Sequence, residues 1–359
     1  MKITTCNLDR FRNIKSTRLR FSRSRVFFVG ENGQGKSNLL EALGLLHAFR
    51  SFRTSDLRNL IQADEVTSRL YFEIENQTAQ TETILLQINR SGGRDAQING
   101  EPCSTLADFL SRFPSVVFGS DDIQLIRGSP SGRRRLLDLH FASTQTGYLE
   151  SLREYTRGIA ARNRLLKNKS DDREIKAFDI PLARAAFSLH QHRKRGVSRL
   201  SPLFRNTFLQ ISGMQEDPML RLNHSFSFSS PEILQEKWNS SLHRDRLLGA
   251  TQTGPHRDDW GFFSNGAVAR DFSSDGQQRN FAIALKLSFL QDLQSVEGNF
   301  PILLVDDVLG ELDSRRRKAF WSAIPSECQL FATGTEFIPP SDSELWEIFK
   351  VEGGKFIRS

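Results

Sequence analysis

The chain has 359 residues, a length that suggests two domains or one core with a large insertion. Its 49 Lys and Arg outnumber its 42 Asp and Glu, and the net charge of +7 favours an acidic partner such as nucleic acid. The hydrophobic content of 38% excludes a disordered chain, and no run of 18 apolar residues predicts a membrane-spanning helix. The first residues also lack the apolar stretch of a signal peptide.

The chain has three cysteines, Cys6, Cys103 and Cys328. They lie far apart in the sequence, their number is odd, and no two of them form a C-x-x-C pair. This pattern is typical of reduced cysteines in a cytoplasmic protein, and it argues against both disulfides and a zinc site.

The first 120 residues have the pattern of mixed strands around one strong helix. The apolar run Val26-Phe27-Phe28-Val29 predicts a strand buried in a parallel sheet. Residues 38–49 predict a helix, because Leu39, Leu43 and Leu46 fall on one stripe. Alternating stretches with turn signals then predict antiparallel hairpins; the stretches are 70–74 and 84–88, and the turns are Ser91-Gly92-Gly93 and Asn99-Gly100.

The middle of the chain is helical in its spacing and strongly basic. Residues 150–205 hold 14 Lys and Arg but only six Asp and Glu, a balance of +8, so the rest of the chain is close to neutral. Two interpretations stay open for this segment: a solvated helical face, or a surface that follows the phosphates of a nucleic acid.

After residue 270 the pattern of a parallel sheet returns. A helical pattern through Phe281, Ala284 and Leu285 leads to the apolar run 302–305, and a second short strand follows at 329–332. We therefore expect an α/β protein in which residues 1–120 and 250–359 form one discontinuous domain. Residues 121–249 are expected to form a helical domain inserted into it.

The segment between the first buried strand and the first helix matches the phosphate-binding pattern G-x-x-x-x-G-K-[ST]. Its glycines allow backbone N–H groups to surround the phosphates at the positive end of the helix. Lys36 is placed to reach the β- and γ-phosphates, and the Ser37 hydroxyl is placed to bind Mg²⁺. The predicted ATP-binding residues are Gly30, Glu31, Asn32, Gly33, Gln34, Gly35, Lys36 and Ser37.

Two carboxylates follow the apolar strand 302–305. In P-loop enzymes an acid at this position holds the metal, and its neighbour orients the attacking water. Because successive side chains of a strand point to opposite faces, we assign Asp306 to Mg²⁺ and Asp307 to the water. The predicted catalytic residues are thus Asp307 and Lys36, although solvated acids at an ordinary strand end give the same local pattern.

Ser274-Asp275-Gly276-Gln277 stands at the start of the last long helix. By itself this segment fits helix capping by Ser or Asp. Its place before the acidic strand, however, matches the S-x-G-Q signature of ABC-type ATPases. We therefore predict that Ser274, Gly276 and Gln277 contact the nucleotide of a second subunit.

Together these motifs resemble the RecF family, a bacterial group of SMC-like ABC ATPases. Further segments resemble that family in the same order along nearly the whole chain. They are Phe11-Arg12-Asn13, Arg50-Ser51-Phe52-Arg53-Thr54-Ser55, Gly128-Ser129-Pro130 with Arg133-Arg134 and Leu137-Asp138, Gly254-Pro255-His256-Arg257-Asp258-Asp259, and the acidic strand extended through Val308-Leu309-Gly310-Glu311-Leu312-Asp313.

The resemblance implies an ABC-type P-loop ATPase head with an inserted helical domain, and ATP with Mg²⁺ as cofactors. It implies a cytoplasmic, nucleoid-associated protein that dimerises head to tail on ATP and binds double-stranded DNA and its junctions with single strands. The implied partners are RecR, RecO and a RecA-type recombinase, which such proteins help to load at gaps during recombinational repair and replication restart. Slow, DNA-stimulated hydrolysis would then release the clamp.

The chain departs from the usual ABC pattern at several positions. Asp275 stands where transporters carry glycine, so we expect its side chain to face away from the phosphates. Asp307 is one methylene shorter than the usual Glu, which is compatible with slow hydrolysis. No histidine follows the last strand, and Thr333 or Thr335 is the candidate for the switch position. Gln124 is the candidate for the glutamine loop.

Basic side chains outside the nucleotide motifs are candidates for DNA binding, although solvated charge runs are an equal alternative. The candidates are Arg133, Arg134, Arg193, Lys194 and Arg195. His256-Arg257-Asp258-Asp259 lacks the spacing of metal ligands and favours a polar network or a contact between lobes. His190 and His192 fall in a charged helix and are predicted to lie on the surface.

Other functions fit parts of the sequence. A transporter-type ABC ATPase subunit shares the nucleotide motifs, but the missing switch histidine and the basic middle argue against it. An SMC chromosome organiser needs long heptad arrays between its halves, which this chain lacks. A scaffold that binds nucleotide without hydrolysing it stays open.

Overall fold

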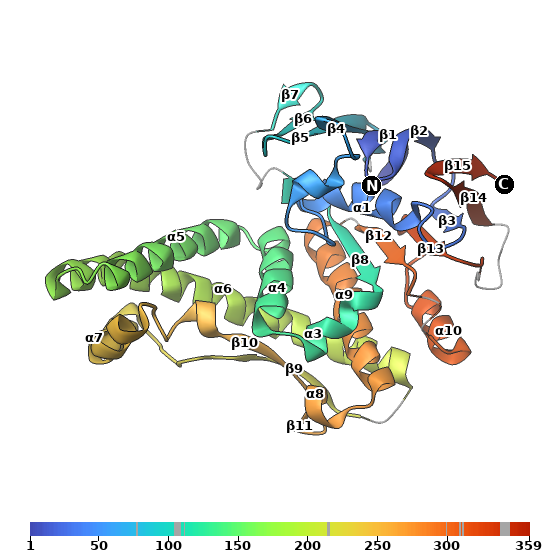
Figure 1. The fold of residues 1–359 in the computed structure, drawn as a ribbon. Helices are drawn as coiled ribbons and strands as arrows, with labels where there is room; N and C mark the ends of the chain where they lie inside the picture. The colour runs from blue at the N-terminus through green and yellow to red at the C-terminus, as the bar shows by residue number, and fades with distance from the viewer. Residues whose placement is uncertain are drawn as a thin grey trace. The chain divides into compact units, whose positions relative to one another are not determined.

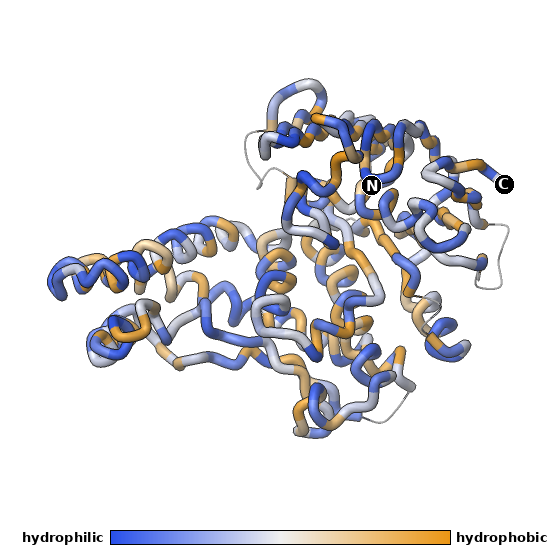
Figure 2. The backbone as a smooth tube through the Cα atoms, in the orientation of Figure 1, coloured by the Kyte–Doolittle hydropathy of each residue, from blue (hydrophilic) through white to orange (hydrophobic). Residues whose placement is uncertain are grey.

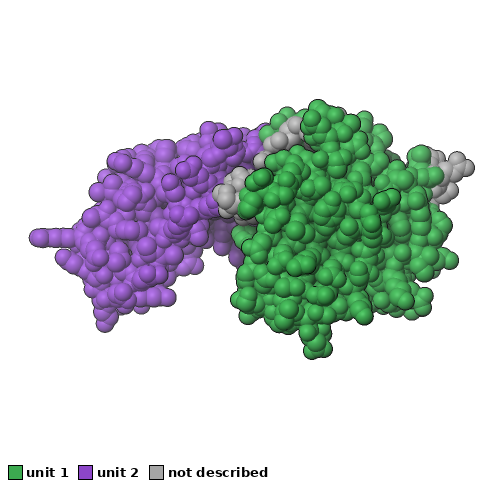
Figure 3. All heavy atoms as spheres, turned by 90° about the horizontal axis from the view of Figure 1, so that it is seen from above, with its two compact units in different colours: residues 1–122, 210–213, 283–359 green, residues 123–209, 214–282 purple. Residues whose placement is uncertain are grey.

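The computed structural model describes residues 1–76, 78–103, 109–110, 112–213, 216–298, 300–308, 310, 312–337 and 345–359 (Figure 1). These residues form two compact units (Figure 3). The first unit contains residues 1–122, 210–213 and 283–359, and the second contains residues 123–209 and 214–282. The sequence analysis assigned residues 250–282 to the discontinuous domain formed by both ends of the chain, whereas in the structure they group with the second unit. The division into an ATPase domain and an inserted domain stays a prediction. Leu309 and Glu311 of the acidic segment lie outside the described residues.

The first unit contains a mainly parallel sheet in the order β15-β14-β3-β13-β12-β8. Strands β14, β3, β13, β12 and β8 pair in parallel, and β15 is antiparallel to β14. Their bounds are β3 Arg25–Val29, β8 Ser115–Gly119, β12 Ile302–Asp306, β13 Leu330–Gly334, β14 Trp346–Glu352 and β15 Lys355–Arg358. The central strands β12 and β13 are buried almost throughout, as apolar strands covered on both faces must be. The predicted strands at 26–29, 302–305 and 329–332 are confirmed.

A second sheet of the first unit is antiparallel, in the order β2-β1-β4-β5-β6-β7. Its strands are β1 Lys2–Phe11, β2 Ile14–Arg20, β4 Thr67–Glu75, β5 Thr81–Asn89, β6 Arg94–Ile98 and β7 Glu101–Pro102. Burial alternates along β4 and β5, because one face of the sheet packs on the core. Asn99 and Gly100 both have positive φ, which suits the tight turn between β6 and β7. The predicted hairpins are confirmed.

Helix α1 (Lys36–Ala48) joins the two sheets into one core. The helix begins after Gly35, whose φ of 115° is left-handed. Its leucines belong to the same hydrophobic cluster as Phe72 of β4, Leu304 of β12 and Phe331 of β13. The first unit also holds η1 (Leu57–Leu60), most of η2 (Ser120–Ile123), α10 (Ser314–Ser322) and most of α9 (Asp275–Glu297), whose first turns group with the second unit.

The second unit is mainly helical but also contains a small antiparallel sheet in the order β11-β10-β9. Its helices are α3 Gln124–Arg127, α4 Pro130–Thr144, α5 Tyr148–Lys167, α6 Asp172–Ser212, α7 Pro231–Leu248, η3 Pro255–Arg257 and α8 Ala269–Phe272. Its strands are β9 Pro218–Asn223, β10 Asp259–Ser264 and β11 Ala267–Val268. The helical expectation for residues 121–249 missed β9, whose six residues alternate between buried and exposed.

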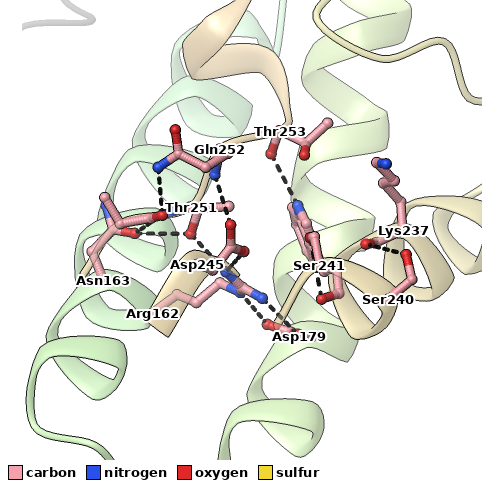
Figure 4. Close-up of polar contacts among 12 residues, drawn as sticks. Arg162, Asn163, Asp179, Lys237, Ser240, Ser241, Asp245, Thr251, Gln252 and Thr253 are labelled. Carbon is pink, nitrogen blue, oxygen red and sulfur yellow. Dashed lines mark hydrogen bonds and ion pairs between the residues drawn. The ribbon is translucent and has the colours of Figure 1, made fainter. Parts of the chain in front are cut away.

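Some of the charged side chains in this middle region are buried. Figure 2 shows hydrophilic and hydrophobic residues interleaved along α5, whose buried face includes the fully buried Arg162. Arg162 forms ion pairs of 2.8 Å with Asp179 of α6 and with Asp245 of α7, and it donates to the Thr251 hydroxyl (Figure 4). A buried charge needs such partners, so this arginine ties three segments together. In the described part of the chain, no helix has the length and apolarity to cross a bilayer.

Candidate nucleotide-binding site

The predicted phosphate-binding turn lies between β3 and α1 and is held in a tight conformation. Gly33 and Gly35 have φ values of 79° and 115°, which side chains other than glycine rarely adopt. A Cβ at Gly30 would lie 2.3 Å from the carbonyl oxygen of Val351. The pattern of glycines therefore has a steric reason in this structure.

Lys36, the first residue of α1, is directed across the turn. Its Nζ donates to the carbonyl oxygens of Gly30 and Glu31, at 2.6 and 2.8 Å. Burial lowers the pKa of Lys36, while the nearby carboxylates of Asp307 and Asp306 raise it. The ammonium is thus held at the turn and close to both acids at the end of β12.

Asp306 at the end of β12 meets two hydroxyl groups. Thr333 of β13 stands opposite it in the parallel register and donates to its Oδ1 at 2.9 Å. Ser37 of the phosphate-binding turn also hydrogen-bonds to the Asp306 carboxylate. Burial raises the pKa of Asp306, and the hydrogen bonds from Ser37 and Thr333 act against this rise. The fold therefore brings the two predicted metal ligands, Ser37 and Asp306, into direct contact.

These two side chains fit a magnesium ion. Mg²⁺ takes oxygen ligands and is commonly bound by one or two carboxylates together with substrate phosphates. The Ser37 hydroxyl and the half-buried Asp306 carboxylate supply such oxygens and lie in contact. Burial disfavours the ionised form of Asp306, and a bound cation would stabilise that form. The assignments of Ser37 and Asp306 to the metal, and of Asp307 to catalysis, remain predictions.

Asp307 has a left-handed backbone, with φ of 54°. Its N–H donates to the Thr333 hydroxyl at 3.0 Å, so one threonine positions both acids. Asp and Asn tolerate this conformation better than most residues. Asp307 therefore lies just beyond β12, and the strand alternation from which the sequence separated the two carboxylates does not extend to it.

Sequence reasoning missed the support that the C-terminal hairpin gives to the phosphate-binding turn. Gly354, between β14 and β15, donates its N–H to the carbonyl of Gln34 at 2.8 Å, and Gly353 donates to the Gln34 side chain at 2.6 Å. No local pattern links residue 34 to residue 353, because parallel pairing of β14 with β3 creates this contact.

A second missed residue is Glu41 of α1, which is completely buried. It accepts two hydrogen bonds from Arg12, at 3.0 and 2.9 Å, and one from the Ser51 hydroxyl. Arg53 lies 3.4 Å from the same carboxylate. Glu41 therefore joins two of the segments on which the family resemblance was based. A single acid within an apolar helical run is the signal that could have identified it.

The S-x-G-Q segment lies in the second unit, at the start of α9. The backbone N–H of Ser274 donates to the Gln277 side chain at 2.8 Å, and the N–H of Gln277 donates back to Ser274 Oγ at 3.3 Å. This is a capping box, so the capping interpretation is confirmed. Ser274 is nevertheless exposed, and the Asp275 side chain is 80% exposed and paired with Arg127.

The arginines proposed for DNA binding differ in their surroundings. Arg133 is buried and forms two bonds of 2.8 Å with Asp259. Arg193 is also buried and pairs with Asp138 at 3.0 and 2.9 Å. DNA contacts by these two arginines are not supported, because their guanidinium groups are used inside the second unit.

The remaining candidates lie nearer to solvent. Lys194 and Arg195 are exposed, and the half-buried Arg134 donates to the carbonyl of Asp258 at 2.6 Å. Gln124, the candidate for the glutamine loop, is exposed at the start of α3. The structure assigns no role to these side chains.

Comparison with known proteins identifies the family. The family model described as RecF/RecN/SMC N terminal domain matches residues 2–336. The DNA replication and repair protein RecF of Leptospira biflexa is 34% identical, over 92% of this chain and 90% of that protein. RecF of Rippkaea orientalis is 33% identical, over 99% of both chains. This chain belongs to the RecF family. The resemblance inferred from the motifs is therefore confirmed.

Solved structures agree with this assignment. The structure of the recombination mediator protein RecF-ATPrS in the RecFOR pathway matches with a TM-score of 0.90 and 30% identity, covering 99% of this chain and 98% of that one. An Smc head bound to the C-winged helix domain of ScpA matches with a TM-score of 0.58 and 17% identity, which shows a shared fold only. The predicted ABC-type ATPase fold is confirmed.

Replacing Thr333 by valine is expected to lower the free energy of unfolding by about 1–3 kcal/mol, because it removes the hydroxyl that serves both Asp306 and the Asp307 N–H. Urea unfolding measures this change. Thr335→Val is the matched control, since Thr335 is exposed, and we expect a change within about 0.5 kcal/mol. Equal effects of the two substitutions would contradict a special role for Thr333.

Proposed function

We propose that this protein is an ATP-dependent DNA-binding clamp of recombinational repair and replication restart, and a weak, DNA-stimulated ATPase. The observation that carries the proposal is the convergence of Lys36, Ser37 and Asp306 beside the glycine turn. Backbone N–H groups and Lys36 bind the phosphates of ATP, and Asp307 orients the attacking water. Ser37 and Asp306 would hold Mg²⁺, which would supply positive charge to neutralise the phosphates.

ATP holds two copies of the chain together in this proposal. The exposed Ser274, with Gly276 and Gln277 at the start of α9, contacts the γ-phosphate bound to the partner subunit's turn. The pairing of Asp275 with Arg127 supports this arrangement. It neutralises the Asp275 carboxylate, which would otherwise repel the γ-phosphate, and holds it against an arginine of the same subunit. Slow hydrolysis then separates the two copies.

DNA is the proposed ligand of the dimer. RecF relatives are named as DNA replication and repair proteins, and the matching solved structure is described as a recombination mediator in the RecFOR pathway. We infer binding to double-stranded DNA and to its junctions with single strands, with Lys194 and Arg195 as exposed candidates for phosphate contacts. RecR, RecO and a RecA-type recombinase are the inferred protein partners, within a cytoplasmic, nucleoid-associated process.

Light scattering tests the proposal on samples with ATP, ADP or no nucleotide, each with and without duplex DNA. We expect the mass to double with ATP alone and the DNA complex to form only with ATP. DNA affinity should fall steeply as salt rises, because each phosphate contact releases counterions. Equal DNA affinity in all three nucleotide states would defeat the proposal of gating.

A pair of serine substitutions isolates the contact between subunits. Ser274→Arg should weaken ATP-dependent dimerisation roughly tenfold or more, by placing a bulky side chain where two copies meet, while ATP still binds to the monomer. Ser295→Arg is the control, because Ser295 is an exposed serine near the other end of α9. Circular dichroism of both variants verifies that the helix remains formed.

A further inference from the structure

Two histidines and an aspartate from distant parts of the sequence meet inside the second unit. They are His190 of α6, His224 directly after β9, and Asp258 directly after η3, and their ligand atoms all lie within 4.8 Å of one another. The prediction that His190 lies on the surface was wrong: it is 5% exposed, and its ring packs against those of His224 and Phe228, with centroids 4.6 and 4.7 Å away.

Two atoms of this cluster are buried without a hydrogen-bond partner among the residues that the structure describes. They are Nδ1 of His190 and Oδ2 of Asp258. The other carboxylate oxygen of Asp258 accepts the N–H of Ser225 at 2.9 Å, which fixes the orientation of the side chain. Buried polar atoms are nearly always satisfied, so the unsatisfied nitrogen of His190 points to a missing partner. Asp258 Oδ2 beside it faces His224 Nδ1 and Arg193 Nη1 at 3.6 and 3.7 Å.

We propose that His190, His224 and Asp258 form a binding site for a first-row transition-metal dication, with Zn²⁺ as the representative ion. Imidazole nitrogen and carboxylate oxygen are the ligand types that such ions accept. Zinc bonds of about 2.1 Å place tetrahedral ligand atoms roughly 3.4 Å apart. His224 Nδ1 and Asp258 Oδ2 are 3.6 Å apart, which is close to this spacing. The three ligand atoms lie within 4.8 Å of one another, so His190 must approach the ion for all three to bind it.

The charges around the cluster are compatible with a cation. Arg193 Nη1 lies 3.7 Å from Asp258 Oδ2, beyond hydrogen-bond distance, and this arginine is already neutralised by its two bonds to Asp138. Arg134 donates to the backbone carbonyl of Asp258 and also interacts electrostatically with its carboxylate. A bound ion would share the Asp258 carboxylate with Arg193, which lies within ion-pair distance of it. The His224 side chain is 26% exposed, which allows the ion to enter and a water molecule to complete the coordination.

The neighbouring His256 is not part of the proposed site. Its Nδ1 pairs with the Tyr155 hydroxyl at 2.6 Å, and its Nε2 with the carbonyl of Thr251 at 2.9 Å. This confirms the polar network predicted for the His256-Arg257-Asp258-Asp259 segment. The ligand set is instead assembled from three separate segments, so a bound ion links α6 to the turns that flank β9 and β10.

Equilibrium dialysis of the nucleotide-free full chain against Zn²⁺, followed by metal analysis, tests the proposal. We expect one saturable ion per chain, and an affinity reduced roughly tenfold or more in His224→Ala. His243→Ala is the matched control, because His243 is an exposed histidine of α7 outside the cluster. Absence of saturable binding, or equal affinity in wild type and His224→Ala, overturns the proposal.

Asp258→Asn gives an independent test. It keeps the shape of the side chain and the acceptor for the Ser225 N–H, but it removes the charge that attracts the ion, so zinc affinity should again fall. Co²⁺ substitution then identifies the ligands by absorption. A thiolate charge-transfer band would place the ion at Cys103 or another cysteine and would overturn the assignment. If Asp258→Asn fails to fold, the partly exposed His224→Ala still decides the question.

Discussion

Lys36→Ala is expected to weaken ATP binding at least about 100-fold, or about 2.7 kcal/mol. The substitution removes the only ammonium of the phosphate-binding turn, and hydrogen bonds to a charged group contribute about 1.5–3 kcal/mol each. It also releases the carbonyls of Gly30 and Glu31, which Lys36 holds in place. Isothermal titration calorimetry with ATP and Mg²⁺ measures the loss.

The matched control for this experiment is Lys15→Ala. Lys15 is an exposed lysine of β2 in the same unit, so its removal changes the net charge equally without touching the turn. We expect its ATP affinity to stay close to that of the wild type. Because Lys36 is the first residue of α1, thermal unfolding of both variants is needed to show that the helix is intact. Unchanged ATP affinity in a folded Lys36→Ala would place the nucleotide elsewhere.

Asp307→Asn is expected to reduce ATP turnover about 10²–10⁴-fold, the range for loss of a general base. Binding of ATP should change only slightly, since the metal contact is assigned to Asp306. Asparagine suits the left-handed backbone of this position, so the substitution removes the charge without adding strain. Single-turnover measurement on the DNA-bound protein separates the chemical step from binding. DNA binding with ATP should survive the substitution.

Asp64→Asn is the control for this substitution. Asp64 is also left-handed, with φ of 65°, but it is exposed in the segment before β4, away from the nucleotide motifs. Its turnover should equal that of the wild type. If Asp307→Asn and the wild type release phosphate at the same rate, Asp307 has no catalytic role. If neither releases phosphate above background, the non-hydrolysing scaffold is the better description.

Local sequence patterns predicted the nucleotide-binding elements well. The run Val26-Phe27-Phe28-Val29 forms β3, and the helix after the glycine turn begins at Lys36. The acids of the second motif lie at the end of β12, where Asp306 is its last residue and Asp307 follows it. These elements could be recognised because their burial is continuous and their turn needs glycine, and both requirements leave a signal within a few residues.

Charge patterns predicted less, because the same residue type serves on the surface and in the interior. Arg133 and Arg193 belong to basic runs that suggest a surface, yet both are buried in ion pairs with distant aspartates. His190 was misassigned for the same reason. A basic residue in an amphipathic helix gives no local sign of an acid that lies many residues away.

The amino-acid sequence by itself determined the glycine turn, the strands that flank it and the family, because each depends on short-range sterics, on hydrophobic patterning or on shared motifs. Only the tertiary structure decided which side chains meet. Thr333 reaches Asp306 and Asp307 through parallel strand pairing, Gly354 reaches Gln34 through a second pairing, and His190, His224 and Asp258 converge from three segments. Such contacts depend on packing between elements, and residues distant in the sequence carry no local record of it.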